Sequence, residues 1–184
     1  TISVNNALVS AGAVTMTANS GLTLSNSTLT GAGNISLQGG SALTLASGMN
    51  ITSSGGNITL GATSITANNG ALTLSSNGNI TVSNALSSVG AVTMNANSGI
   101  TLASSLTAAG AVVLDADLDN NGTGDFTISS GTLSTGNNAL TVTANDLTLT
   151  GVLNSGTGST TINVSDGGSL GVGFTSGFGM NLTT

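Results

Sequence analysis

The sequence predicts an all-β protein: a triangular parallel β-helix, or β-solenoid, with about 21 residues in each turn and eight to nine turns. Three observations lead to this fold class. Short apolar motifs with strand periodicity recur along the chain, turn-forming residues separate them, and matching positions return about every 21 residues.

The expected strands are short segments in which two aliphatic residues flank a threonine, such as LTL at 22–24, ITL at 58–60 and LTV at 140–142. This alternation places the aliphatic side chains on one face of a strand and the threonine on the other. Gly, Asn and Ser, which favour turns, bound each motif. Abundant β-branched residues and frequent glycines disfavour helix.

The expected strands form three interleaved columns, each predicted to make one interior row. The first column is Ile2, Leu22, Leu43, Ile65, Leu86, Leu106, Phe126 and Leu147; the second is Leu8, Leu29, Ile51, Leu72, Val92, Val112, Leu133 and Leu153; the third is Val14, Ile35, Ile58, Ile80, Ile100, Leu118, Leu140 and Ile162. One turn cannot bury its aliphatic face alone, but stacked turns enclose a continuous core. An up-and-down barrel or a sandwich is the alternative architecture.

A longer repeat is superimposed on the short one. Residues 2–25 align without gaps on residues 80–103, with 17 of 24 positions identical. This 78-residue repeat spans eleven expected strands, which is not a multiple of three. Either the three faces of the solenoid are interchangeable, or the strand count is wrong by one.

The composition excludes several classes of function. The 184 residues contain no Lys, Arg, His, Cys, Pro, Trp or Tyr, and Asp supplies all six acidic groups. Nucleic-acid binding needs cations to neutralise phosphates, and most general acid–base and nucleophilic chemistry needs the side chains that are missing. Ligands for zinc and other soft metals are also missing. No apolar run is long enough for a transmembrane helix. We therefore expect neither an enzyme, nor a nucleic-acid-binding protein, nor a transmembrane segment.

Four of the six acidic residues lie within one eleven-residue segment that makes a candidate calcium site. They are Asp115, Asp117, Asp119 and Asp125. Carboxylates at alternate positions followed by Asn121 and Gly122 resemble the start of a calcium-binding loop, where oxygen ligands converge around a tight turn. The closing bidentate Glu of such loops is missing, so Asp125 would have to replace it. The alternative is a solvated loop whose acids favour solubility.

The polar faces and turns suggest two further features. Pairs such as Thr15 and Thr17, or Thr141 and Thr143, point outward and resemble ice-binding rows, although Ser, Asn, Ala and Gly interrupt the pattern. The alternative is that threonine is simply a good strand former on a solvated face. Asparagines in the Gly-Asn-Ile-Thr strings are expected to stack as amide ladders between turns.

Residues 1–165 carry the solenoid pattern, and residues 166–184 form a glycine-rich tail. The tail contains Phe174 and Phe178, two of the three aromatic residues of the chain. We expect it to cap the end of the solenoid or to contact another subunit.

The strings GAVTMTANSGLTLSNSTLTGAGNISL and GGNITLGATSITANNGALTLSSNGNITV resemble filamentous-haemagglutinin-like and autotransporter-associated β-strand repeats. Such repeats occur in very large secreted bacterial adhesins. The resemblance covers about residues 2–165 and implies a right-handed β-helical shaft at the cell surface. The absence of Lys and Arg departs from the family and argues against glycosaminoglycan binding.

Taken together, these features predict a structural shaft of an extracellular bacterial surface adhesin or a self-assembling fibre. Its expected partners are copies of itself, stacked end to end, or further repeats of a longer parent chain. Strand edges at the ends of a solenoid favour such stacking when no positive charge, proline or capping helix prevents pairing. The alternatives are a binding module for ice, glycans or calcium on the flat Thr/Ser/Asn faces, and a functional amyloid, because the LTL segments are uncharged and free of proline.

Overall fold

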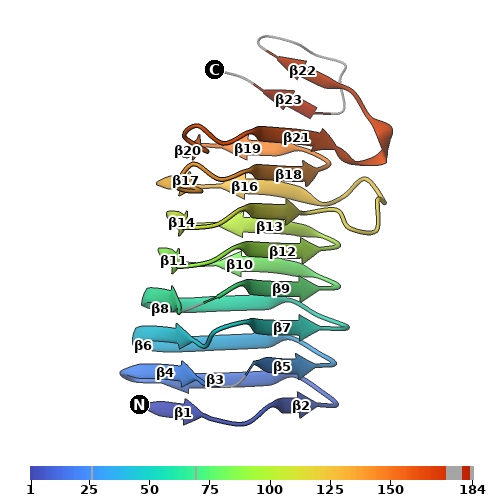
Figure 1. Cartoon of the computed structure of the whole chain (residues 1–184). Helices are drawn as coiled ribbons and strands as arrows, with labels where there is room; N and C mark the ends of the chain where they lie inside the picture. The colour runs from blue at the N-terminus through green and yellow to red at the C-terminus, as the bar shows by residue number, and fades with distance from the viewer. Residues whose placement is uncertain (26, 69, 173–179, 183–184) are drawn as a thin grey trace.

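In the computed structural model, the chain winds upward from its N-terminus as a stack of coils with three parallel faces (Figure 1). The structure describes residues 1–25, 27–68, 70–172 and 180–182. All strand pairs in the stack are parallel, and the second face contains eight strands, one from each coil. The predicted β-solenoid is confirmed.

The three faces are numbered in the order in which the chain meets them. The first face holds β1 (Ile2–Val4), β4 (Gly21–Leu24), β11 (Leu86–Ser88), β14 (Leu106–Ala108), β17 (Thr132–Ser134) and β20 (Val152–Asn154). The second holds β2 (Leu8–Ser10), β5 (Thr28–Gly31), β7 (Met49–Ser53), β9 (Leu72–Ser76), β12 (Val92–Ala96), β15 (Val112–Asp115), β18 (Leu140–Ala144) and β21 (Thr160–Val164). The third holds β3 (Val14–Ala18), β10 (Asn79–Val82), β13 (Gly99–Leu102), β16 (Asp125–Ile128) and β19 (Leu147–Leu149).

Two long strands, β6 (Ile35–Leu45) and β8 (Ile58–Ala67), turn the corner from the third face to the first and belong to both. After β21 follow a short 3-10 turn, η1 (Ser165–Gly167), and two strands that pair only with each other, β22 (Leu170–Val172) and β23 (Met180–Leu182). None of the described helical segments is long and apolar enough to cross a membrane.

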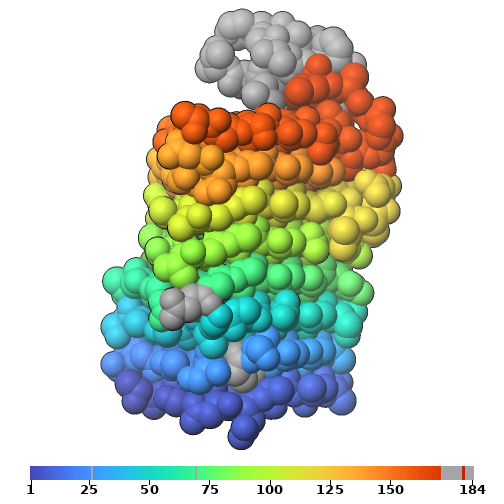
Figure 2. All heavy atoms as spheres, viewed as in Figure 1, coloured from blue at the N-terminus to red at the C-terminus, as the bar shows by residue number. Residues whose placement is uncertain are grey.

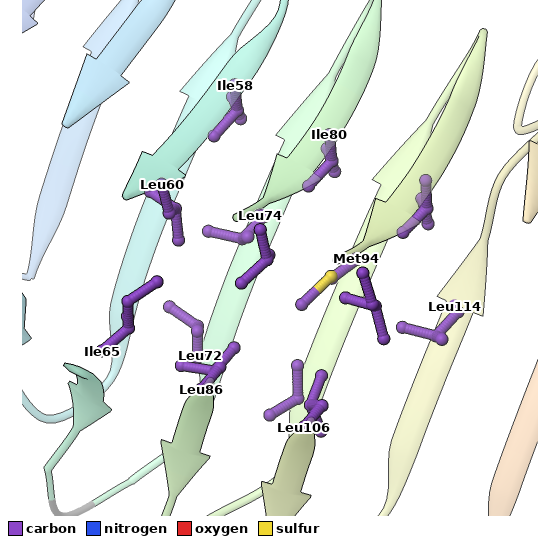
Figure 3. Close-up of a cluster of buried hydrophobic side chains, with 14 of the residues drawn as sticks. Ile58, Leu60, Ile65, Leu72, Leu74, Ile80, Leu86, Met94, Leu106 and Leu114 are labelled. Atoms are coloured by element: carbon purple, nitrogen blue, oxygen red, sulfur yellow. The ribbon is translucent and has the colours of Figure 1, made fainter. Parts of the chain in front are cut away.

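The core is a set of aliphatic rows that run along the solenoid axis. Leu22, Leu43, Ile65 and Leu86 lie opposite one another in register on the first face and are buried. Figure 3 shows side chains from all three faces converging in the interior of the same coils. The predicted first interior row is therefore confirmed through these coils.

The predicted columns are wrong beyond residues 116–124, because these residues form a loop between β15 and β16 and contribute no strand. Leu118, which was expected in the third interior row, is 47 % exposed in this loop. Each later strand therefore lies one face away from its predicted column. The observed partners are Leu106 with Leu133, Val112 with Leu140, and Ile100 with Phe126.

A smaller correction concerns the second face. Ile51 pairs with Leu74, and Met49 pairs with Leu72, so the predicted pairing of Ile51 with Leu72 is two residues out of register. Both leucines point inward because they are separated by two positions. The predicted column therefore moves to the neighbouring interior row of the same face.

The long sequence repeat is rotated by one face in the structure. Ile2 lies on the first face, whereas its repeat counterpart Ile80 lies on the third; Val14 lies on the third face and its counterpart Val92 on the second. Nearly the same sequence thus forms strands on different faces. The faces are interchangeable, and the separate error in strand count applies only beyond the loop.

Asparagine side chains connect successive coils at the corner before the third face. Asn34 Oδ1 accepts the backbone N–H of Asn57 (2.9 Å), and Asn57 Oδ1 accepts the backbone N–H of Asn79 (2.8 Å). Each amide thus satisfies a backbone donor of the next turn. The predicted asparagine contacts between coils are present here, but they join a side-chain amide to the backbone; a side-chain to side-chain amide hydrogen bond joins Asn79 Nδ2 to Asn57 Oδ1 (3.5 Å).

Candidate functional site

The acidic loop connects β15 to β16 and projects from one side of the stack (Figures 1 and 2, yellow). Backbone hydrogen bonds to the neighbouring coils hold both ends of the loop. Leu118 N–H donates to Ala96 O of the coil below (3.0 Å), and Asn145 N–H of the coil above donates to Gly124 O (2.8 Å). The loop is therefore anchored between its neighbours along the rod.

The two ends of the loop cross closely at Gly124. A Cβ atom at this position would lie 1.9 Å from the carbonyl oxygen of Ala116. No side chain fits such a separation, so this crossing requires glycine.

Asp117 is completely buried beneath the loop. Its carboxylate accepts the backbone N–H groups of Asn121 (3.1 Å) and Gly122 (3.0 Å) and the hydroxyl of Ser165 (2.6 Å). Burial raises the pKa of Asp117, but these hydrogen bonds favour the carboxylate more strongly and leave its pKa below the ordinary value. Asp117 is therefore a buried, ionised group at neutral pH.

The other three predicted ligands have different surroundings. Asp115 is half-buried and accepts the N–H of Asp117 (3.3 Å); burial raises its pKa, and the neighbouring charge of Asp117 adds to the rise. Asp119 and Asp125 are exposed and accept side-chain amides of Asn121 (2.9 Å) and Asn145 (3.0 Å). The four acids share one loop but differ in exposure and in bonding.

Within the described part of the chain, no three His, Cys, Asp or Glu side chains are grouped so as to hold a metal ion. Sequence reasoning missed two residues that the fold brings to the loop. Ser165 reaches Asp117, and the carboxylate of Asp166 lies against Gly122. No local signal marks either residue, because both lie more than 40 positions along the chain.

Calcium binding at the acidic loop stays a prediction, and we expect it to be weak. An ion would have to displace hydrogen bonds that already satisfy Asp117. Calorimetric titration should show at most a weak signal that Asp117→Asn removes and Asp146→Asn, outside the loop, leaves unchanged. Tight binding by the native chain would contradict this expectation, and no heat at all would leave only the solvated-loop interpretation.

The outward hydroxyl-bearing side chains form ordered rows, of which the third face has the most regular. Its row consists of Thr15, Ser36, Thr59, Thr81, Thr101, Thr127 and Thr148, each opposite the next in register. On the broader second face, Val113 and Asp115 interrupt two such rows. A binding function for these faces stays a prediction.

A shallow, open hollow lies at the corner between the third and first faces. Gln38, Gly40, Ala62, Thr63 and Asn84 contribute to its lining. Its lining residues carry polar but no acidic or basic side chains.

Comparison of the chain with protein-family models, with curated proteins and with solved structures gave no match.

Proposed function

We propose that the chain is a structural shaft: a rigid stretch of an extracellular bacterial surface adhesin or of a self-assembling fibre, without enzymatic activity. The observation that carries this proposal is the continuity of the core. On the first face, partners run in register from Ile2 to Leu153, through every coil. A stack of eight coils about 4.8 Å apart makes a rod about 35–40 Å long.

The rotated long repeat supports an extendable shaft. Because nearly the same 24 residues build strands on different faces, a further repeat needs no special face on which to begin. In such arrays the stability comes from each coil and from its contacts with neighbouring coils. The rod can therefore be lengthened by adding further coils.

The first coil offers a surface for continuation. Ile2 is 38 % exposed, and Val4 and Leu8 are only half-buried, whereas their partners one coil further on are buried. A covering coil would bury these side chains and pair the strand edge of β1 and β2. The proposed occupant is a coil of another copy or of a longer parent chain.

Electron microscopy and sedimentation of the purified chain test the proposal. We expect end-to-end rods that lengthen with protein concentration. Ile2→Lys, which puts a charge at the open edge, should shorten them, whereas Val9→Lys should not, because Val9 is 75 % exposed on the outer side of the second face. A native chain that stays monomeric at high concentration would contradict self-stacking.

A further inference from the structure

The bond between Asp117 and Ser165 joins two parts of the chain that are 48 residues apart. The hydroxyl of Ser165 donates to Oδ2 of Asp117 at 2.6 Å, and both residues are buried. Asp117 belongs to the acidic loop, and Ser165 is the first residue of η1, directly after the last strand of the second face. The bond therefore connects the side of the rod to the start of the C-terminal segment.

A second contact interlocks the same two segments. Asp166 has a left-handed backbone (φ 60°), and its carboxylate lies so close to Gly122 that a Cβ atom there would be 2.6 Å from Oδ2. A side chain at Gly122 would thus push η1 away from the loop. The short turn is held by a buried hydrogen bond and by close packing.

The segment that η1 leads into lies across the C-terminal end of the stack. Figure 1 shows β22 and β23 beyond the last coil. Met180 of β23 is completely buried within the same hydrophobic cluster as the solenoid core, and its N–H donates to Ser169 O (3.0 Å). The predicted contacts of Phe174 and Phe178 lie outside the described residues. Met180, which sequence analysis did not single out, is the side chain seen to cover this end.

The two ends of the rod differ on the third face, where β23 contacts β19 at the C-terminal end. At the first coil, Ile2 is 38 % exposed, whereas on β19, the last strand of the third face, Leu147 is buried and Leu149 is half-buried. On the other two faces of the last coil, Leu153 and Ile162 are half-buried, as Val4 and Leu8 are at the first coil. Residues of the same chain therefore cover the C-terminal end on the third face.

We propose that β22 and β23 form a removable cap and that the Asp117–Ser165 hydrogen bond is its latch. The cap covers the third-face part of the surface on which the first coil of a second copy docks, so release of the latch completes that surface and favours end-to-end stacking. This inference rests on the proposed shaft function and selects the capping alternative for the tail over the inter-subunit contact. The occupant is a second copy because the first coil presents the apolar side chains Ile2, Val4 and Leu8, matching an apolar core end.

The chemistry of Asp117 suits this role. Hydrogen bonds to an ionised carboxylate are stronger than those between neutral groups, and burial shields them from competing water. The charged neighbours Asp115, Asp119 and Asp166 are all acidic, so no salt bridge replaces the bond if Ser165 is lost. Removing the hydroxyl should therefore leave the carboxylate held by the loop while the cap loses its anchor.

Hydrogen exchange on three variants tests the latch. Ser165→Ala and Asp117→Asn remove or weaken the bond; Asp125→Asn changes an exposed acid of the same loop and is the control. We expect amide exchange in residues 169–172 and 180–182 to rise about tenfold or more in the two latch variants, but not in the control. Exchange in β8, β10 and β13 should stay unchanged in all three. Unchanged exchange at the cap, or equally faster exchange in those strands, would overturn the latch.

Assembly of a truncated chain separates this inference from the proposed function. Deleting residues 168–184 should expose the end of the core, so that rods lengthen at lower protein concentration than with the native chain, and Ser165→Ala should act in the same direction. Shorter or absent rods after deletion, while the native chain still assembles, would make the tail an adaptor and overturn the cap but not the shaft. Failure of every form to assemble would instead contradict self-stacking.

Discussion

Replacing Ile58 with Asp should unfold the chain or prevent its coils from stacking. Ile58 is completely buried at the start of β8, opposite Ile35 and Ile80 in the interior row of the third face. An unpaired carboxylate in this position costs several kcal/mol, a large share of the roughly 5–15 kcal/mol that stabilises a typical domain. Loss of the far-ultraviolet β signal, or a strongly lowered midpoint of denaturation, would be the expected result.

The neighbouring residue provides a matched control. Thr59 lies in the same strand but points outward, between Ser36 and Thr81. Thr59→Asp introduces the same carboxylate into solvent and should cost about 1 kcal/mol or less. Equal destabilisation by both substitutions would contradict the assignment of inner and outer faces.

Phe126→Ala should destabilise the chain by about 3–5 kcal/mol. Among the residues that the structure describes, Phe126 is the largest completely buried side chain, and it lies between Ile100 and Leu147 on the third face. Its removal leaves a cavity inside the first coil after the acidic loop, where stacked neighbours cannot collapse freely. Chemical denaturation monitored by circular dichroism would measure the loss.

Leu118→Ala is the control that separates the observed register from the predicted one. In the predicted columns Leu118 is an interior residue, and its truncation would cost about 2–5 kcal/mol. In the structure it is 47 % exposed in the loop, so we expect a change within about 1 kcal/mol. A large effect at Leu118 would support the predicted columns instead.

The sequence predicted the solenoid because its periodicity directly reflects the geometry. Each coil before the loop uses 20 to 23 residues between partners, so inward aliphatic residues recur at nearly constant spacing. The prediction failed at Leu118 because the loop carries the same alternation of apolar and polar residues as a strand. Phe126 follows Ile100 by 26 residues, whereas Ile100 follows Ile80 by 20, and sequence spacing alone does not show where the extra residues lie.

The sequence predicted the acidic loop of the candidate site but not the residues that reach it from later coils, because the predicted register was wrong beyond the loop. The run of alternating acids identified the loop, and turn chemistry explains why Asn121 and Gly122 donate to Asp117. The bond to Ser165 depends on the stacking of two further coils above the loop. Because the predicted register was shifted beyond Leu118, no sequence argument could place Ser165 beside Asp117.

Disulfide cross-linking tests the central claim, stacked coils in the observed register, most directly. The chain has no cysteine, so any disulfide comes from an introduced pair. Thr107 lies opposite Ser134 on the first face, whereas the predicted columns would place it opposite Thr127. Neighbouring parallel strands are about 4.8 Å apart, within the Cα separation that a disulfide spans.

Mass spectrometry after mild oxidation would compare the two double variants. We expect an intramolecular disulfide in Thr107→Cys with Ser134→Cys, and free thiols in Thr107→Cys with Thr127→Cys. Cross-linking of the second pair but not the first would contradict the observed register.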